Sequence, residues 1–189
     1  MDEGFALRAR LRQVGLELFR QEGLRFTMQE AAEAIHVSKK TIYSVYDSKE
    51  DLLLDMIDDA FRKIHARKQA ILDGPGTLRE KLEAVIIALP EEYMALDLQQ
   101  MKLLDEKYPA LAERVREHLE TGWEPTLELL EQAMASGIIR RVSLPVLQRM
   151  ISASIECFLR DRCLEEQGVS YPQALEEMIS ILMEGLLER

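Results

Sequence analysis

Lys39, Lys40 and Thr41 stand side by side in a short polar segment that also contains Tyr43. Ammonium and hydroxyl groups of this kind donate hydrogen bonds to the edges of DNA bases and to phosphate oxygens. They reach base edges when they occupy the first turn of a helix that lies in the major groove. The four residues therefore predict a DNA contact, provided that the surrounding chain builds and presents such a helix.

Capping signals around these residues predict that helix and a partner for it. Thr27 and Glu30 have the spacing of a capping box, which starts a helix over 28–34. Ser38 is a typical N-cap for a second helix, over 38–44. Two short capped helices joined by a tight turn make a helix-turn-helix, whose second helix enters the major groove.

Helix starts on either side of the motif are expected to hold phosphate. Thr27 opens one helix, and Lys49 follows Ser48, the cap of a third. Backbone N–H groups at helix N-termini favour anions and support such contacts. The predicted DNA-binding residues are Thr27, Ser38, Lys39, Lys40, Thr41, Tyr43 and Lys49.

The order of residue types over 5–55 resembles the N-terminal signature of the TetR (tetracycline repressor) family of bacterial transcription regulators. His36 stands where that family usually has glycine in the turn, which predicts left-handed backbone at a residue that tolerates it better than most. Tyr46, as in the family, is expected to lie in the core under the motif. The matching residues are Gly23, Leu24, Thr27, Ala31, Ala32, Val37, Ser38, Thr41, Ile42, Tyr43, Tyr46 and Ser48 to Leu52.

The resemblance implies an all-α fold with a DNA-binding head at 1–49 and an effector-binding and dimerisation body at 50–189. It implies a cytoplasmic homodimer that binds an inverted-repeat operator, most simply as a repressor, and that a small-molecule effector of unknown identity releases. A helical adaptor that keeps the head without binding an operator is the alternative. His36 and the acidic net charge are its support.

Family members dimerise through their last two helices, which here are expected at 144–167 and 172–188. A stripe on the first of these helices and a wide apolar face on the second are the predicted interface, although an intrachain core would use the same residue types. The interface residues are Met150, Ala153, Cys157, Leu175, Met178, Ile179, Leu182, Met183 and Leu186.

Family members also bind their effector among the helices of the body, where methionine and aromatic side chains suit an adaptable apolar pocket. For each candidate an ordinary core position is the competing interpretation. Acidic residues near the candidates would favour a cationic ligand, although acids on a helix are usually solvated. The pocket candidates are Phe61, Tyr93, Met94, Leu98, Met101, Trp123, Leu127 and Phe158.

Composition agrees with a helical protein that has a small DNA-reading head. The chain has 189 residues, of which 47% are hydrophobic and only 6% aromatic. The net charge is −10 but uneven: eight basic and seven acidic residues in 1–49 give +1, and the rest gives −11. An acidic body would repel DNA and restrict binding to the head. Long helices are expected at 5–21 and 48–72, and helical segments at 92–107 and 110–136.

Other function classes find little support in the sequence. The three histidines lie in separate elements without metal-ligand spacing, no glycine-rich phosphate loop is present, and no cofactor or enzymatic activity is expected. No apolar run approaches the ~18 residues of a membrane span, and the N-terminus lacks the features of a signal peptide. Cys157 and Cys163 are expected to be reduced packing thiols.

Overall fold

The computed structural model describes residues 3–86, 88, 107–160, 164 and 166–187, and these divide into two compact units. The first unit holds residues 3–61 and 107–115. The second holds the remaining described residues, from 62 onward. Two helices, α4 (Lys49–Asp73) and α8 (Pro109–Glu120), each contribute to both units.

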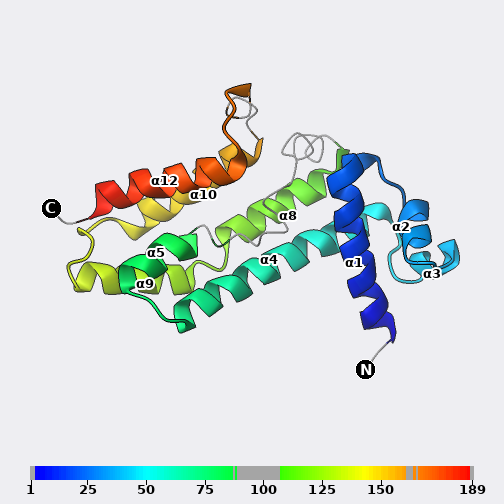
Figure 1. Cartoon of the computed structure of the whole chain (residues 1–189), viewed down its shortest axis with the longest axis horizontal. Helices are drawn as coiled ribbons and strands as arrows, with labels where there is room; N and C mark the ends of the chain where they lie inside the picture. The colour runs from blue at the N-terminus through cyan, green and yellow to red at the C-terminus, as the bar shows by residue number, and fades with distance from the viewer. Residues whose placement is uncertain (1–2, 87, 89–106, 161–163, 165, 188–189) are drawn as a thin grey trace. The chain divides into compact units, whose positions relative to one another are not determined.

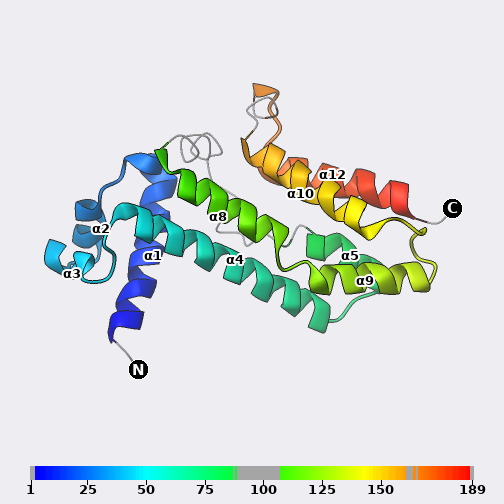
Figure 2. The ribbon, with the colours of Figure 1, turned by 180° about the vertical axis from the view of Figure 1, so that it is seen from behind.

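The first unit is built on α1 (Glu3–Glu22), which is followed by the 3-10 helix η1 (Gly23–Arg25), by α2 (Met28–Ala34) and by α3 (Lys39–Tyr43). Figures 1 and 2 show α2 and α3 next to each other beside α1, with α4 starting directly after them. Apolar side chains of these helices meet in one core, to which the longer helices contribute faces with residues at spacings of three and four and α3 contributes Ile42. Fully buried members of this core are Leu11, Phe26, Ile42 and Leu52.

The second unit contains α5 (Leu78–Ile86), α9 (Glu124–Ala135), α10 (Leu144–Arg160) and α12 (Tyr171–Leu186). Both ribbon views show α10 and α12 side by side (Figures 1 and 2). Their inner faces join α5 and α9 around a second core, to which every one of these helices contributes fully or nearly fully buried side chains. Examples are Leu82, Leu130, Ile151 and Met183.

The all-α prediction is confirmed: regular structure in the described ranges is helical, and the only β feature there is an isolated bridge between Ile139 and Leu187. The helix predicted over 28–34 has those bounds, and the long helix predicted over 48–72 is Lys49–Asp73. The segment predicted as helical over 110–136 forms α8 and α9, which are separated at Gly122. The helix predicted at 92–107 lies outside the described residues, apart from Lys107.

Within the described ranges, each helix is either too short or too polar to cross a bilayer.

Candidate nucleic-acid interface

The start of α2 is fixed by the capping box that the sequence predicts. The Thr27 hydroxyl accepts from the Glu30 backbone N–H at 3.2 Å, and Glu30 Oε2 accepts from the Thr27 N–H at 2.6 Å. The hydrogen bond from the Thr27 hydroxyl, followed by the backbone bond, lowers the pKa of Glu30. Thr27 is exposed, as a phosphate contact requires, but its hydroxyl already serves the cap.

His36 closes α2 in the left-handed conformation that the sequence predicts, with φ of 57°. Its N–H donates to the carbonyl of Glu33 at 3.0 Å, and the N–H of Val37 donates to the carbonyl of Ala32 at 2.9 Å. These two bonds are those of a Schellman motif, which usually has glycine at the left-handed position. The turn therefore forms without glycine, at the cost of a strained histidine.

The helix α3 begins at Lys39 because Ser38 caps it, accepting from the N–H of Thr41 at 3.0 Å. Ile42 is fully buried and anchors the helix to the first core. Lys39 and Lys40 are exposed, and the Tyr43 side chain is 41% exposed. The helix thus presents two ammonium groups and a phenol on its outer side, while one apolar residue holds it in place.

The first turn of α3 brings the polar groups together as the sequence predicts. The Lys39 ammonium lies 5.8 Å from the centroid of the Tyr43 ring, and the hydroxyls of Ser38 and Thr41 are 2.8 Å apart. This cluster offers two cations and two hydroxyls on a single helical turn. Such a set of donors suits phosphate oxygens and the acceptors at base edges.

Lys49 stands at the start of α4, where the sequence predicts a helix N-terminus, but its ammonium is engaged within the protein. Its ammonium donates to the carbonyl of Leu24 at 2.7 Å and to that of Phe26, and it lies 4.1 Å from the centroid of the Phe26 ring. Desolvation is the main cause that lowers its pKa, with the nearby charge of Lys107 adding to it. These contacts tie the start of α4 to the end of η1 and leave the ammonium little freedom to bind phosphate.

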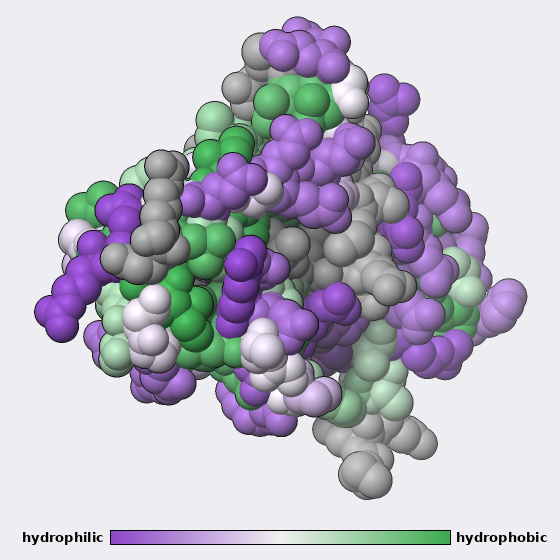
Figure 3. Space-filling view, turned by 60° about the vertical axis from the view of Figure 1, so that its left-hand side comes forward, coloured by the Kyte–Doolittle hydropathy of each residue, from purple (hydrophilic) through white to green (hydrophobic). Residues whose placement is uncertain are grey.

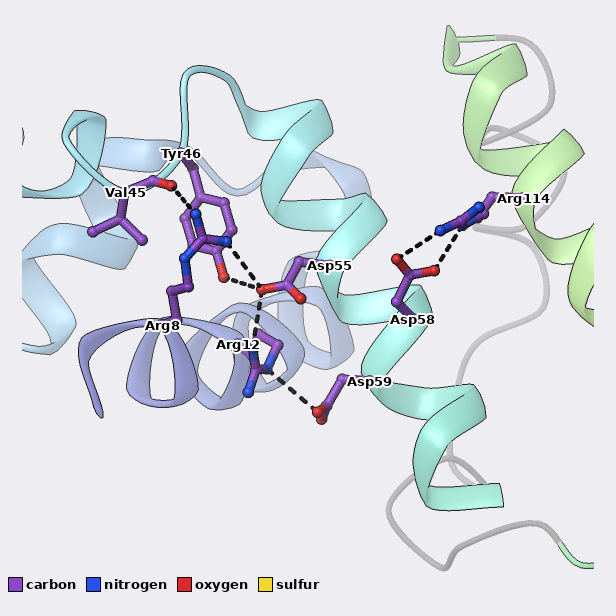
Figure 4. A network of polar contacts seen from close by, with 8 residues as sticks. All are labelled: Arg8, Arg12, Val45, Tyr46, Asp55, Asp58, Asp59 and Arg114. Carbon is purple, nitrogen blue, oxygen red and sulfur yellow. Dashed lines mark hydrogen bonds and ion pairs between the residues drawn. The ribbon is translucent and has the colours of Figure 1, made fainter. Parts of the chain in front are cut away.

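A polar network that was not predicted from the sequence connects α1 with α4 and includes Tyr46, which follows α3 (Figure 4). The Tyr46 hydroxyl donates to Asp55 Oδ2, and Arg12 donates to the same oxygen at 3.0 Å. Arg12 Nε also lies 3.4 Å from Asp59 Oδ1. Desolvation and the bond to Asp55 raise the pKa of Tyr46, so the phenol remains a neutral donor.

Arg8 extends this network by donating to the carbonyl of Val45 at 3.0 Å, with its guanidinium 5.1 Å from the centroid of the Tyr46 ring. The signal in the sequence was a matched spacing: Arg8 and Arg12 are four residues apart on α1, and Asp55 and Asp59 are four apart on α4. Tyr46, 3% exposed, is a core residue as expected, and its hydroxyl reaches a carboxylate.

The predicted pocket residues separate into three groups. Trp123 belongs to the second core, and Leu127 and Phe158 pack against that core. Phe61 is half-buried and belongs to the first unit. The other four candidates, Tyr93, Met94, Leu98 and Met101, lie outside the described residues.

The predicted interface residues divide between exposed and buried positions. Met150, Ala153 and Cys157 are exposed along one side of α10, with the Met150 side chain at 52%. By contrast, Leu182 is half-buried against the second core, and the remaining five form part of it: Leu175, Met178, Ile179, Met183 and Leu186. The sequence-based assignment of this α12 face needs correction, because α5 and α10 of the same chain already cover it.

The outer side of α12 instead carries Ile181, whose side chain is 70% exposed. Val146, one turn before Met150 on α10, is 57% exposed. Apolar surface among polar side chains is visible on the face drawn in Figure 3, in green among purple. Cys157 is a free thiol, as predicted, and is exposed on α10, so it does not pack in the core of the single chain. Cys163 lies outside the described residues.

Comparison with known proteins agrees with this architecture. Residues 11–56 match the family model of bacterial regulatory proteins of the tetR family. An uncharacterised HTH-type transcriptional regulator, YvaF, from Bacillus subtilis (strain 168) is 25% identical over 173 residues, which are 89% of this chain and 90% of that protein. The matched head contains the Ser38 cap, the strained turn and the whole of α3.

Two solved structures share the fold. A regulator from Saccharomonospora viridis in complex with choline has a TM-score of 0.77 and 17% identity, and covers 97% of this chain and 99% of its own. The regulator FadR from Bacillus subtilis in complex with stearoyl-CoA has a TM-score of 0.65 and 18% identity, and the match covers 94% of this chain and 98% of FadR. The capped helix pair, the exposed lysines of α3, the match of the head and the relative along most of the chain lead to one conclusion: residues 11–56 form a DNA-binding head of the kind found in the tetR family of bacterial regulatory proteins, and the protein is a DNA-binding transcriptional regulator.

Proposed function

We propose that this regulator is a homodimeric repressor that binds an inverted-repeat operator and is released by a small-molecule effector. The proposal of a DNA-binding surface rests on the geometry of α3. Ser38 caps this helix, and the fully buried Ile42 anchors it to the core. Lys39 and Lys40 are exposed on it. Each protomer would place this helix in one half-site, so that the two-fold symmetry of the dimer matches that of the operator.

The proposed base and phosphate contacts come from Lys39, Lys40, Thr41 and Tyr43, with Ser38 orienting the helix. Lys49 would not bind DNA. Its hydrogen bonds to the carbonyls of Leu24 and Phe26 would instead hold the start of α4 against the head. Thr27 would contribute through its position at the start of α2, since its hydroxyl is engaged with Glu30.

The proposed dimer interface is the exposed side of α10 and α12. Exposed apolar residues recur on α10 at Val146, Met150, Ala153 and Cys157, at the spacing of one helix face, and Ile181 adds an exposed apolar residue on α12. A contiguous apolar surface of this kind is typical of a contact with another protein. Small residues such as Ala153 allow two helices to approach closely.

Effector control is supported by relatives of the same fold whose structures contain choline or stearoyl-CoA. In this chain an effector in the second unit would act on the head through α4 and α8, since both helices contribute to both units. Asp58 on α4 and Arg114 on α8 form a two-bond pair at 2.7 and 3.1 Å within the first unit (Figure 4). The operator is released if the effector binds more tightly to a conformation of the dimer in which the distance between the two DNA-binding heads does not fit the two half-sites.

The DNA test selects binding sites from random duplexes and then measures affinity for the enriched sequence. An inverted repeat should be enriched, and Lys39→Ala or Lys40→Ala should weaken binding at least tenfold. Arg67→Ala, at an exposed position on α4 in the second unit, is the matched loss of one positive charge and should keep wild-type affinity. Failure to enrich any DNA would favour the adaptor alternative.

The dimer test introduces one carboxylate on the proposed interface. Met150→Glu and Ile181→Glu should each yield monomers in sedimentation and lose operator affinity, because an unpaired charge in an apolar interface is costly. Ala66→Glu, at an exposed position on α4, is the control. A folded Met150→Glu, Ile181→Glu double variant that remains dimeric would place the interface elsewhere.

A further inference from the structure

Lys68 on α4 is the first part of an unexplained polar cluster in the second unit. Its side chain is half-buried, and its ammonium lies 5.3 Å from the centroid of the Trp123 ring. Among the described residues, no carboxylate forms an ion pair with it. Ile71 and Leu72, about one turn further along α4, pack against the second core, so this part of the helix is directed toward it. Desolvation lowers the pKa of Lys68, as expected for a cation that burial leaves without a counter-charge.

Thr126 is the second part. The residue has zero exposure, and its Oγ1 has no hydrogen-bond partner within the part of the chain that the structure describes. A buried hydroxyl without a partner lowers the stability of the folded state, and native proteins contain few of them. Thr126 is the third residue of α9, and helical Cα–Cβ bonds tilt toward the helix N-terminus, so its hydroxyl lies along the first turn.

The N-terminus of α9 is the third part. Its N-cap residue is Trp123, which makes no side-chain capping bond, and Pro125 follows in the first turn. The N-cap side chain therefore supplies no acceptor to the positive end of this twelve-residue helix, and the acidic residue of its first turn is Glu124. Trp123 connects the three parts, because it precedes α9, lies near the Lys68 ammonium and is 7% exposed in the second core.

His65 and Gly122 form one side of this cluster. A Cβ on Gly122 would lie 2.2 Å from His65 Cε1, and Gly122 has φ of 68°, so only glycine fits beneath the imidazole. Desolvation and the charges of Lys68 and His118 lower the pKa of His65, whereas Glu124 opposes that shift. Among the described residues, Glu124 is the carboxylate that acts on His65, and it is exposed to solvent.

We propose that this cluster binds the carboxylate of a small, mostly apolar effector, with the Lys68 ammonium as its counter-charge and the Thr126 hydroxyl as a hydrogen-bond donor. The apolar remainder of the molecule would contact Trp123 and the adjoining core. A single negative charge matches the one ammonium, and the Thr126 hydroxyl can donate one hydrogen bond to it. The positive charge of Lys68 disfavours a cationic ligand, which acidic residues in the sequence had suggested. The proposal rests on the proposed effector control and gives its ligand a chemical class.

The test compares probes that have similar apolar tails and an anionic, neutral or cationic head group. Octanoate and 4-phenylbutyrate are measured against 1-octanol, 4-phenyl-1-butanol and octyltrimethylammonium. Binding is followed by the melting temperature of the dimer and by the fluorescence of Trp123, the single tryptophan of the chain. At least one carboxylate should bind tenfold or more tightly than its alcohol, and more tightly than the ammonium probe.

Variants then assign the preference to the cluster. Lys68→Met and Thr126→Val, both close in size to the native residues, should each weaken carboxylate binding at least tenfold, and Arg67→Met should not. Without ligand, Lys68→Met should melt at or above the wild-type temperature, because a half-buried ammonium without an ion pair is removed. A structural role beside Trp123 alone would lower that temperature.

Two results would overturn the inference: wild-type protein that binds no carboxylate better than its alcohol, or Lys68→Met protein that keeps the carboxylate affinity. The proposed function is tested separately, by measuring whether each compound releases the protein from operator DNA. An alcohol or ammonium probe that releases the operator would leave effector control intact and show that the anion preference is wrong. If no compound of a broader screen that stabilises the dimer changes operator affinity, effector control itself fails.

Discussion

Removing the Asp55 carboxylate should destabilise the first unit more than any other single change to the polar network in Figure 4. In Asp55→Ala the Tyr46 hydroxyl loses its acceptor inside a residue that is 3% exposed, and Arg12, whose side chain is 13% exposed, loses its contact at 3.0 Å. A buried polar group that loses its partner costs ~1–3 kcal/mol. Arg12 keeps Asp59 at 3.4 Å, which reduces its share. We therefore expect a total loss of about 2–4 kcal/mol.

Tyr46→Phe separates the two contributions, because it removes only the hydroxyl and leaves the ion pair of Arg12 with Asp55. Its expected cost is about 1.5–3 kcal/mol, the value of one hydrogen bond to a charged group. Since both residues share one contact, the double variant should lose less than the sum of the single variants. The Arg8 pair with Asp55, at 3.9 Å and with Arg8 49% exposed, should contribute little.

The assay is urea denaturation followed by circular dichroism, with hydrogen exchange of α3 amides to locate the effect in the first unit. Asp47→Ala is the control, since Asp47 is exposed in the same unit. If Asp55→Ala loses no more stability than Asp47→Ala, or if the effects of Asp55 and Tyr46 are additive, the network does not hold α1, the turn after α3 and α4 together.

Three further predictions concern the backbone and the pH dependence. His36→Gly should raise the stability of the first unit by about 0.5–1 kcal/mol in urea denaturation, because φ of 57° favours glycine, and an unchanged or lower stability would contradict the strain. Gly122→Ala should lower the melting temperature through both its φ of 68° and the contact with His65, and a smaller loss in Gly122→Ala, His65→Ala than in Gly122→Ala alone would identify that contact. The folded-state pKa of His65 lies below its unfolded value, so its protonation opposes folding: the stabilising effect of neutral His65 should be complete above pH ~6.5 and decline as pH falls below that value. The decline between pH 7 and 5 should be shallower in His65→Gln, and equal slopes would show that this group is not responsible.

The sequence by itself determined the local features of the head. The capping box of Thr27 with Glu30, the Ser38 cap and the left-handed His36 all depend on hydrogen bonds between residues three to five positions apart. Such bonds form wherever the local chain allows them, so residue type and spacing are sufficient to predict them. The recognition helix and the family resemblance follow from the same residues.

Only the tertiary structure decided which partner a side chain meets across the fold. Lys49 has the same sequence signal as a phosphate-binding lysine, but the carbonyls that it binds belong to a segment more than twenty residues earlier. The wide apolar face of α12 suits a core or a dimer interface equally well, and the packing of α5 and α10 against it makes it core. The outer side of α12 keeps an exposed Ile181. Helical periodicity gives the apolar face of a helix but not the surface that covers it, because burial depends on contacts between segments distant in the chain.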